Sequence, residues 1–190
     1  MKAFATSLIA LCFGLPLMAE PITYTMTGTL SGTLGGVAVT DATFKFVFNG
    51  DTANIFDASP TLLLNPATST SLFITGFGSG DFTQTIDVGV DLQDDNAGFA
   101  NPGLTDIFVI QNAAFGAWND ATSIGPLEQF GAASQVQGSF STSLGTLALI
   151  GADNVSFGAA VPEPSLIAFV GCSMLGTIVR RSWIRRTRAS

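Results

Sequence analysis

The chain has 190 residues and a formal charge of −7, and six of its 7 basic side chains lie in the two ends. From Glu20 to Glu163 there are 14 acidic residues and one basic residue, Lys45, so this segment carries a formal charge of −13. Such a segment repels phosphate groups, which excludes nucleic-acid binding. The chain also lacks histidine, which rules out Ser/His/Asp and Cys/His catalysis.

The first 19 residues have the pattern of a secretory signal peptide. Lys2 is followed by an apolar stretch over residues 3–17 and by Leu17-Met18-Ala19. A short positive region, a short apolar core and a small residue at the cut are typical of such peptides. We expect export through the Sec translocon and cleavage by signal peptidase between Ala19 and Glu20. The glycine and proline in this stretch disfavour the alternative, an N-terminal core helix.

Residues 20–160 are predicted to form one all-β domain, an antiparallel β-sandwich or jelly roll. Apolar and polar residues alternate with period two over 22–30, 43–48, 82–92 and 136–144, and the apolar run 107–110 predicts a central strand buried on both faces. Short strands of this kind, separated by turn residues, favour antiparallel sheets. The side chains expected to face the core are Ile22, Tyr24, Met26, Leu30, Phe44, Phe46, Phe48, Phe82, Ile86, Val88, Val90, Leu92, Val136, Phe140 and Leu144.

Several segments between the strands are predicted to be turns or loops. The least regular segment is 113–133, in which 124–130 is expected to form one helical turn. Gly158-Ala159-Ala160 is interpreted as a short flexible tether. Both cysteines, Cys12 and Cys172, lie in the terminal segments, so no disulfide is expected in the domain. The predicted turns are Gly35-Gly36, Asn49-Gly50-Asp51, Ser79-Gly80-Asp81, Asn101-Pro102-Gly103 and Gly151-Ala152-Asp153-Asn154.

The densest group of oxygen ligands lies between residues 91 and 98. Asp91, Asp94, Asp95 and Asn96 are weak candidates for calcium, which favours six to eight oxygen ligands, and no other cofactor is expected. The spacing is not that of an EF-hand, so a solvated turn is the alternative. Asp87 and Asp91 share a strand face but lie about 13 Å apart, which is too far for one metal ion.

A glycan-binding site is the alternative function suggested by the loop around Trp118. Its ring could stack on a sugar, with Asn119 and Asp120 binding hydroxyl groups. A Trp that fills the core is the structural alternative. A carboxylate-only hydrolase is disfavoured, because nothing selects two catalytic acids among those present.

The last thirty residues combine three features. Val161-Pro162-Glu163-Pro164 is expected to be extended, because proline fixes φ and lacks an amide donor. Residues 165–179 carry no charge and predict a single short transmembrane helix. The arginines after this helix are expected to keep that end in the cytoplasm. They are Arg180, Arg181, Arg185, Arg186 and Arg188.

Together, these features over residues 161–188 resemble the PEP-CTERM sorting signal of exported bacterial proteins. The resemblance implies that exosortase recognises Pro162, Glu163 and Pro164, and that the arginines form the terminal basic cluster. It also implies transient membrane anchoring and a final location at the cell surface or in an exopolysaccharide matrix, with extracellular polysaccharide as a candidate partner. A plain single-pass anchor is the alternative. We therefore expect a non-catalytic exported protein with one β-sandwich ectodomain.

Overall fold

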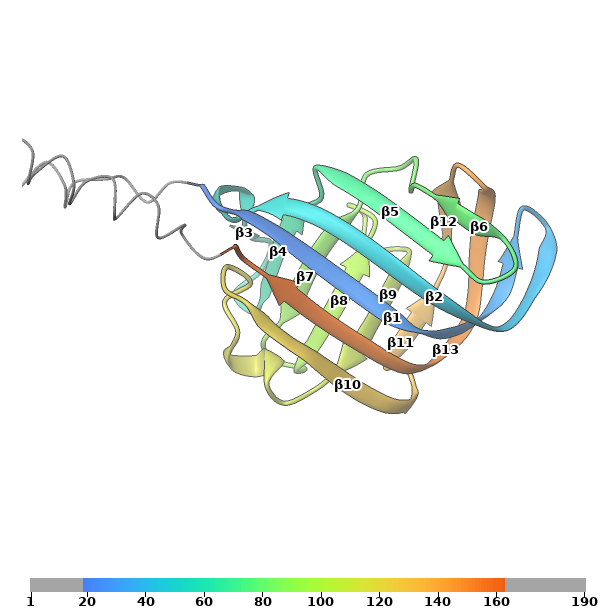
Figure 1. Ribbon diagram of the computed structural model, residues 1–190. Helices are drawn as coiled ribbons and strands as arrows, with labels where there is room; N and C mark the ends of the chain where they lie inside the picture. The colour runs from blue at the N-terminus through green and yellow to red at the C-terminus, as the bar shows by residue number, and fades with distance from the viewer. Residues whose placement is uncertain (1–18, 163–190) are drawn as a thin grey trace, which may run out of the picture. The chain divides into compact units, whose positions relative to one another are not determined.

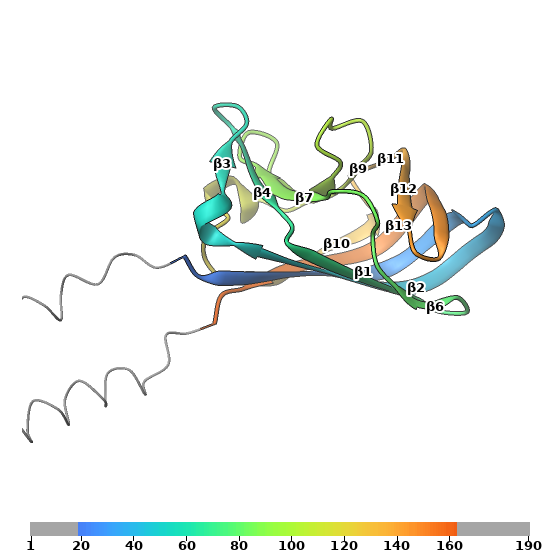
Figure 2. The same ribbon diagram turned by 90° about the horizontal axis from the view of Figure 1, so that it is seen from above.

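The computed structural model describes residues 19–162, which fold into two antiparallel β-sheets packed face to face (Figure 1, Figure 2). Two short 3-10 helices, η1 (Thr52–Asn54) and η2 (Phe115–Ala117), lie in the connections. The first sheet contains β1 (Pro21–Leu34), β2 (Val37–Asp51), β5 (Ser69–Ile74), β6 (Gly78–Gly80), β10 (Ile124–Ala132), β12 (Ser139–Thr142) and β13 (Gly145–Ala160). The second contains β3 (Phe56–Asp57), β4 (Leu62–Pro66), β7 (Asp87–Asp91), β8 (Asn96–Ala100), β9 (Ile107–Gln111) and β11 (Gln135–Gln137).

The two sheets confirm the prediction of an antiparallel all-β domain. In the first sheet the strand order is β10-β13-β1-β2-β5-β6, and β12 also pairs with β13; in the second it is β11-β9-β8-β7-β4-β3. β1 pairs with β13 from Thr23 opposite Ala160 to Leu34 opposite Leu147. The first and last strands of the domain therefore lie side by side in the interior of the first sheet, and the domain begins and ends at the same end of the sandwich (Figure 1).

The core between the sheets is rich in phenylalanine. The predicted apolar faces of 22–30 and 43–48 are confirmed, because every side chain predicted to face inward there is at most 3% exposed. The rings contact one another edge-on or tilted, the arrangement that aromatic quadrupoles favour. The central rings are Phe44, Phe46, Phe48, Phe82, Phe99, Phe108 and Phe140.

Segments that cross between the sheets differ from the predicted strands. The strand predicted over 82–92 is regular only from Asp87, because residues 82–86 pass from β6 to β7 and Phe82 makes a single bridge to Thr142. Phe82 and Ile86 are nevertheless buried, as expected. The strand predicted over 136–144 divides into β11 and β12, which belong to different sheets.

Gly138 makes the second crossing possible. Its φ of +87° lies in the left-handed region, and an added Cβ would lie 2.8 Å from the Cα of Asp106. The carboxylate of Asp106 accepts a hydrogen bond from the amide of Ser139, at 2.9 Å. The chain therefore changes sheets within a single residue.

Several other local predictions are wrong. Residues 124–130 form part of β10 rather than a helical turn, because this segment pairs with the edge of β13. Three predicted turns lie in strands: residues 49–51 end β2, residues 151–154 lie in β13 where its pairing with β1 shifts register, and two of the residues 79–81 belong to β6. β9 is an interior strand, but Ile107 and Val109 are only half-buried, so it is not buried on both faces.

Candidate functional site

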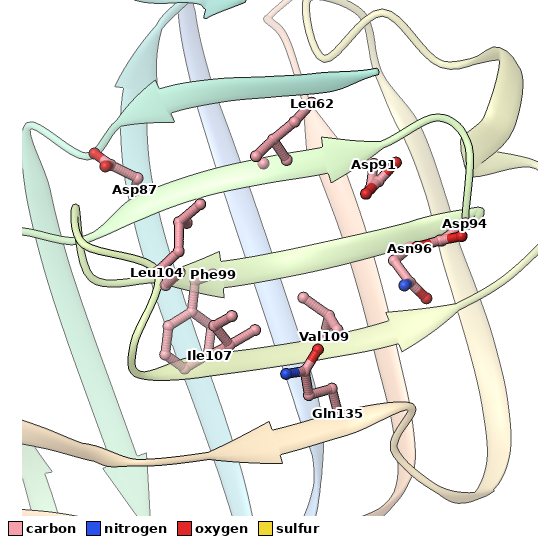
Figure 3. Close-up of a pocket in the computed structure, with 12 residues that line it drawn as sticks. Leu62, Asp87, Asp91, Asp94, Asn96, Phe99, Leu104, Ile107, Val109 and Gln135 are labelled. Carbon is pink, nitrogen blue, oxygen red and sulfur yellow. The ribbon is translucent and has the colours of Figure 1, made fainter. Parts of the chain in front are cut away.

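A shallow hollow lies on the outer face of the second sheet, the face turned away from the core (Figure 3). It encloses about 210 Å³. The hollow is bounded at its centre by bare backbone, because Gly89 of β7 pairs with Gly98 of β8 and neither carries a side chain. The lining residues include Leu62, Asp87, Asp91, Asp94, Asn96, Leu104, Ile107, Val109 and Gln135.

Gly98 is required by the close approach of β9. An added Cβ would lie 2.1 Å from the carbonyl oxygen of Phe108 and 2.7 Å from the Cα of Val109. Both atoms belong to the backbone, so a side chain at this position would push the two strands apart. The absence of side chains at the centre of the hollow is therefore a consequence of tight strand packing.

The hollow is acidic at both ends. Asp87 and Asp91 lie at opposite ends of β7 on the same face, as predicted, and Asn96 pairs with Asp91 across the strands (Figure 3). Asp87 is only 5% exposed, and burial raises the pKa of its carboxyl group. The lining contains no basic side chain, so the hollow suits a neutral, hydroxyl-rich ligand or a cation rather than an anion.

The structure brings together three of the four calcium candidates. Asp91, Asp94 and Asn96 line the hollow, whereas the carboxylate of Asp95 lies against Gly116 of η2. One carboxylate oxygen of Asp91 accepts the amide of Gln93 at 3.0 Å and so stabilises the turn. Within residues 19–162, no three Asp, Glu, His or Cys side chains lie close enough to hold a metal ion. Calcium binding at this turn stays a prediction.

Trp118 fills the core and is not a sugar-stacking platform. It is 5% exposed, and its ring contacts those of Tyr24, Phe115 and Phe157 at centroid distances of 5.9–6.4 Å. Its indole nitrogen donates to the carbonyl of Thr122 at 2.9 Å. Because the ring is covered on several sides, the prediction that Trp118 stacks on a sugar is wrong. The core-filling alternative is confirmed.

The two neighbours of Trp118 have structural roles as well. Asn119 accepts hydrogen bonds from the amide of Ala121 and the hydroxyl of Thr122, which closes a local turn. Asp120 is 0% exposed and has a φ of +58°. Asp120 is therefore not placed to bind the hydroxyl groups of a sugar at the surface, whereas Asn119 is exposed but lies beside a buried Trp118.

A buried polar cluster was missed by the sequence analysis. The hydroxyl of Tyr24 accepts from the side-chain amide of Asn65 at 2.7 Å and donates to the carbonyl of Asp120 at 3.4 Å. Burial raises the pKa of Asp120 to about 8, although a hydrogen bond with the Tyr24 side chain acts in the opposite direction. Burial also raises the pKa of Tyr24, as does the charge of Asp120.

One sequence signal pointed to this cluster. The chain has a single tyrosine, and it lies on the apolar face of the first predicted strand. A buried tyrosine hydroxyl needs a hydrogen-bond partner, so polar residues were to be expected near it. The pattern does not reveal that these partners are Asn65 and Asp120, which are 41 and 96 residues away along the chain.

The described residues include the predicted signal-peptide cut and end at the first residue of the Pro-Glu-Pro tripeptide. Ala19 is exposed, and Glu20 is tied to Thr52 by two hydrogen bonds of 3.0 Å each. Pro162 is the last described residue, so Glu163, Pro164, the helix predicted over 165–179 and the five arginines lie outside the described residues. In the part of the chain that the structure describes, no helix is long and apolar enough to cross a membrane.

Comparisons with known proteins give no family for this chain. No protein-family model matches it, no curated protein matches it, and no solved structure resembles it significantly.

Proposed function

We propose that this chain is a non-catalytic exported protein of the cell surface or exopolysaccharide matrix, sorted by exosortase through Pro162-Glu163-Pro164. One observation carries the proposal: the fold occupies the interval between the two sorting segments predicted from the sequence. Pairing with β2 begins at Pro21, after the expected signal-peptide cut, and β13 ends at Ala160, before the Pro-Glu-Pro tripeptide. A domain delimited in this way needs neither terminal segment for its sheets.

The C-terminal junction supports presentation of the tripeptide at the edge of the domain. The predicted flexible tether at residues 158–160 is wrong, because these residues belong to β13 and pair with β1. Val161 follows directly, and its amide donates to the hydroxyl of Ser123 at 2.9 Å. The tripeptide therefore follows a fixed strand, and exosortase would meet it within a few residues of the sheet.

Sorting is tested by the intact mass of the protein recovered from envelope and matrix. We expect the natural protein to lose the segment containing Arg180–Ser190 in a strain with exosortase and to keep it in a strain without. Glu163→Ala should also keep it, because the recognition carboxylate is absent. Glu128→Ala removes an acidic side chain on β10 and should be processed normally. Retention of the arginines in the natural protein with exosortase present would show a permanent membrane anchor.

A glycan-binding role is a second candidate, and the hollow on the second sheet favours it. Carboxylate groups at its rim can accept hydrogen bonds from sugar hydroxyls, and side-chain amide groups can donate to them. Gly89 carries no side chain, so a sugar ring could lie directly over β7. The acidic lining selects neutral glycans over anionic ones. This candidate no longer depends on Trp118.

A glycan array probed with the full chain tests this second candidate. We expect a neutral oligosaccharide to bind, and Asp91→Asn to weaken that binding roughly tenfold by removing a charge-assisted hydrogen bond. Asp57→Asn makes the same change on β3, away from the hollow, and should have no effect. Equal binding by both variants would place any glycan elsewhere.

A further inference from the structure

The C-terminal end of β13 is held by a single side chain. The hydroxyl of Ser123 accepts a hydrogen bond from the amide of Val161 at 2.9 Å and donates one to the carbonyl oxygen of Val161 at 3.4 Å. The pairing of β13 with β1 ends one residue earlier, with Thr23 opposite Ala160. Within residues 19–162, no other group bonds to the backbone of Val161. We call this pair of hydrogen bonds the Ser123 clamp.

The loop that carries Ser123 is anchored in the core. Trp118 is buried, and its indole nitrogen donates to the carbonyl of Thr122, the residue before Ser123. Asp120, in the middle of the loop, is fully buried. Ile124, the residue after Ser123, already pairs with β13. Ser123 is therefore fixed from both sides, and its hydroxyl is held against the end of the strand.

Pro162 stops the strand from extending beyond the clamp. Proline has no amide donor, and its ring restricts the preceding residue to extended conformations. The hydrogen-bonded part of the strand therefore ends at Val161, whose half-buried side chain packs against the core. The Pro-Glu-Pro tripeptide begins at the very next residue.

An enzyme that cuts near the tripeptide competes with the sheet for the same backbone. Extended peptides are bound largely through their main-chain N–H and C=O groups. Of the two residues before Pro162, Ala160 is paired with β1 and Val161 is bound to Ser123. The strand end must therefore leave the sheet before an enzyme can enclose it. Cleavage of such a segment follows the population of its open state when opening and closing are fast.

We propose that the Ser123 clamp sets the rate at which exosortase processes this protein, because the enzyme acts on the state in which Val161 has left Ser123. This inference rests on the proposed sorting function and adds the regulation of its processing site. The folded domain itself limits how often the backbone before the tripeptide is free. Breaking the clamp raises the population of the open state, and the processing rate rises in proportion.

The processing rate of the full chain in exosortase-containing membranes tests the proposal, with loss of the segment Arg180–Ser190 followed by intact mass. Ser123→Ala should be processed about fivefold faster than the natural protein, because it lacks the hydroxyl that holds Val161. Ser123→Thr keeps a hydroxyl and should be processed at the natural rate. Ser134→Ala removes another exposed hydroxyl, in the bend between β10 and β11, and should also have no effect. Equal or slower processing of Ser123→Ala would overturn the proposal.

A flexible insertion separates the effect of the clamp from a general loss of stability. Gly-Ser-Gly-Ser placed between Val161 and Pro162 moves the tripeptide away from the sheet. The insertion variant should be processed faster than the natural protein, and adding Ser123→Ala to it should give no further gain. A second fivefold gain would show that the substitution acts elsewhere in the fold, which would overturn the proposal.

Hydrogen exchange tests the clamp without exosortase. Mass spectrometry of the full chain in detergent measures amide exchange in peptides that cover residues 158–161. Exchange there should be faster in Ser123→Ala than in the natural protein, and unchanged in Ser123→Thr and Ser134→Ala. Equal exchange in Ser123→Ala would show that Ser123 does not hold the strand end. Absence of processing in the natural protein would overturn the sorting function and this inference with it, whereas equal rates in processed variants would overturn this inference alone.

Discussion

Phe99→Ala is expected to destabilise the domain by about 3–5 kcal/mol, a large part of the roughly 5–15 kcal/mol that stabilises most domains. Phe99 is 1% exposed on β8 and lies at the centre of the aromatic core. Alanine would leave a large cavity that the surrounding sheets cannot close. Urea unfolding of the full chain in detergent measures the loss. The rings within 6 Å of Phe99 belong to Phe46, Phe48, Phe82, Phe108 and Phe140.

The matched control for this variant is Phe130→Ala. Phe130 lies on β10 and is 81% exposed, so the same change of side chain removes little buried area. It should alter the free energy of unfolding by less than about 0.5 kcal/mol. If both variants unfolded at the same urea concentration, the aromatic cluster would not be the main source of stability.

Raising the pH from 4 to 8 is expected to destabilise the protein through Asp120. Burial raises the pKa of this carboxyl group from 3.8 to about 8, so the folded state holds a proton that the unfolded state has released. Its stabilising contribution is complete below pH 3.8 and is lost as the pH rises through 8. A difference of about four pKa units corresponds to a loss on the order of 5 kcal/mol.

Asp120→Asn isolates this contribution, because asparagine does not titrate. The slope of unfolding free energy against pH should be shallower in the variant over the same range. Burial also raises the pKa of Asp87, which acts in the same direction, but that effect is present in both proteins and cancels in the comparison. Identical slopes would mean that the carboxyl group of Asp120 is not desolvated.

The sequence predicts the fold best where one face of a strand is buried and the other is exposed. β1 and β2 show this most clearly, since threonines flank the buried Tyr24 and the exposed Lys45 separates the buried Phe44 and Phe46. Alternation also identifies the inward side of residues 136–144, although those residues lie in two sheets. The pattern reports which way a side chain faces but carries no information about which strand is its partner.

The wrong local predictions have a common cause. Glycine-rich and polar segments such as 49–51 and 151–154 have high turn propensity, yet pairing with β1 holds them in long strands. Residues 124–130 likewise become a strand because β13 has a free edge there. These pairings connect residues far apart along the chain, so local propensity could not reveal them.

The candidate site was only partly predictable for the same reason. The strand pattern placed Asp87 and Asp91 on one face, and the run from Asp91 to Asn96 identified one acidic end of the hollow, but neither revealed the orientation of Asp95 toward Gly116. The Tyr24 cluster depends on contacts between both sheets and a loop. Spacing along the sequence cannot show contacts between residues so far apart in the chain.

The pairing of β1 with β13 also determines how the domain responds to mechanical force. Both ends of the domain leave from neighbouring antiparallel strands at the same end of the sandwich, with Thr23 opposite Ala160. Tension applied between these two ends would separate the strands one hydrogen bond at a time, at low force. Tension applied from the C-terminal end to the turn at Gly35-Gly36 would instead run along the strands and load many hydrogen bonds at once. The domain should therefore unfold at a higher force when it is held at its C-terminus and pulled from the far end of the sandwich than when it is pulled by its two termini.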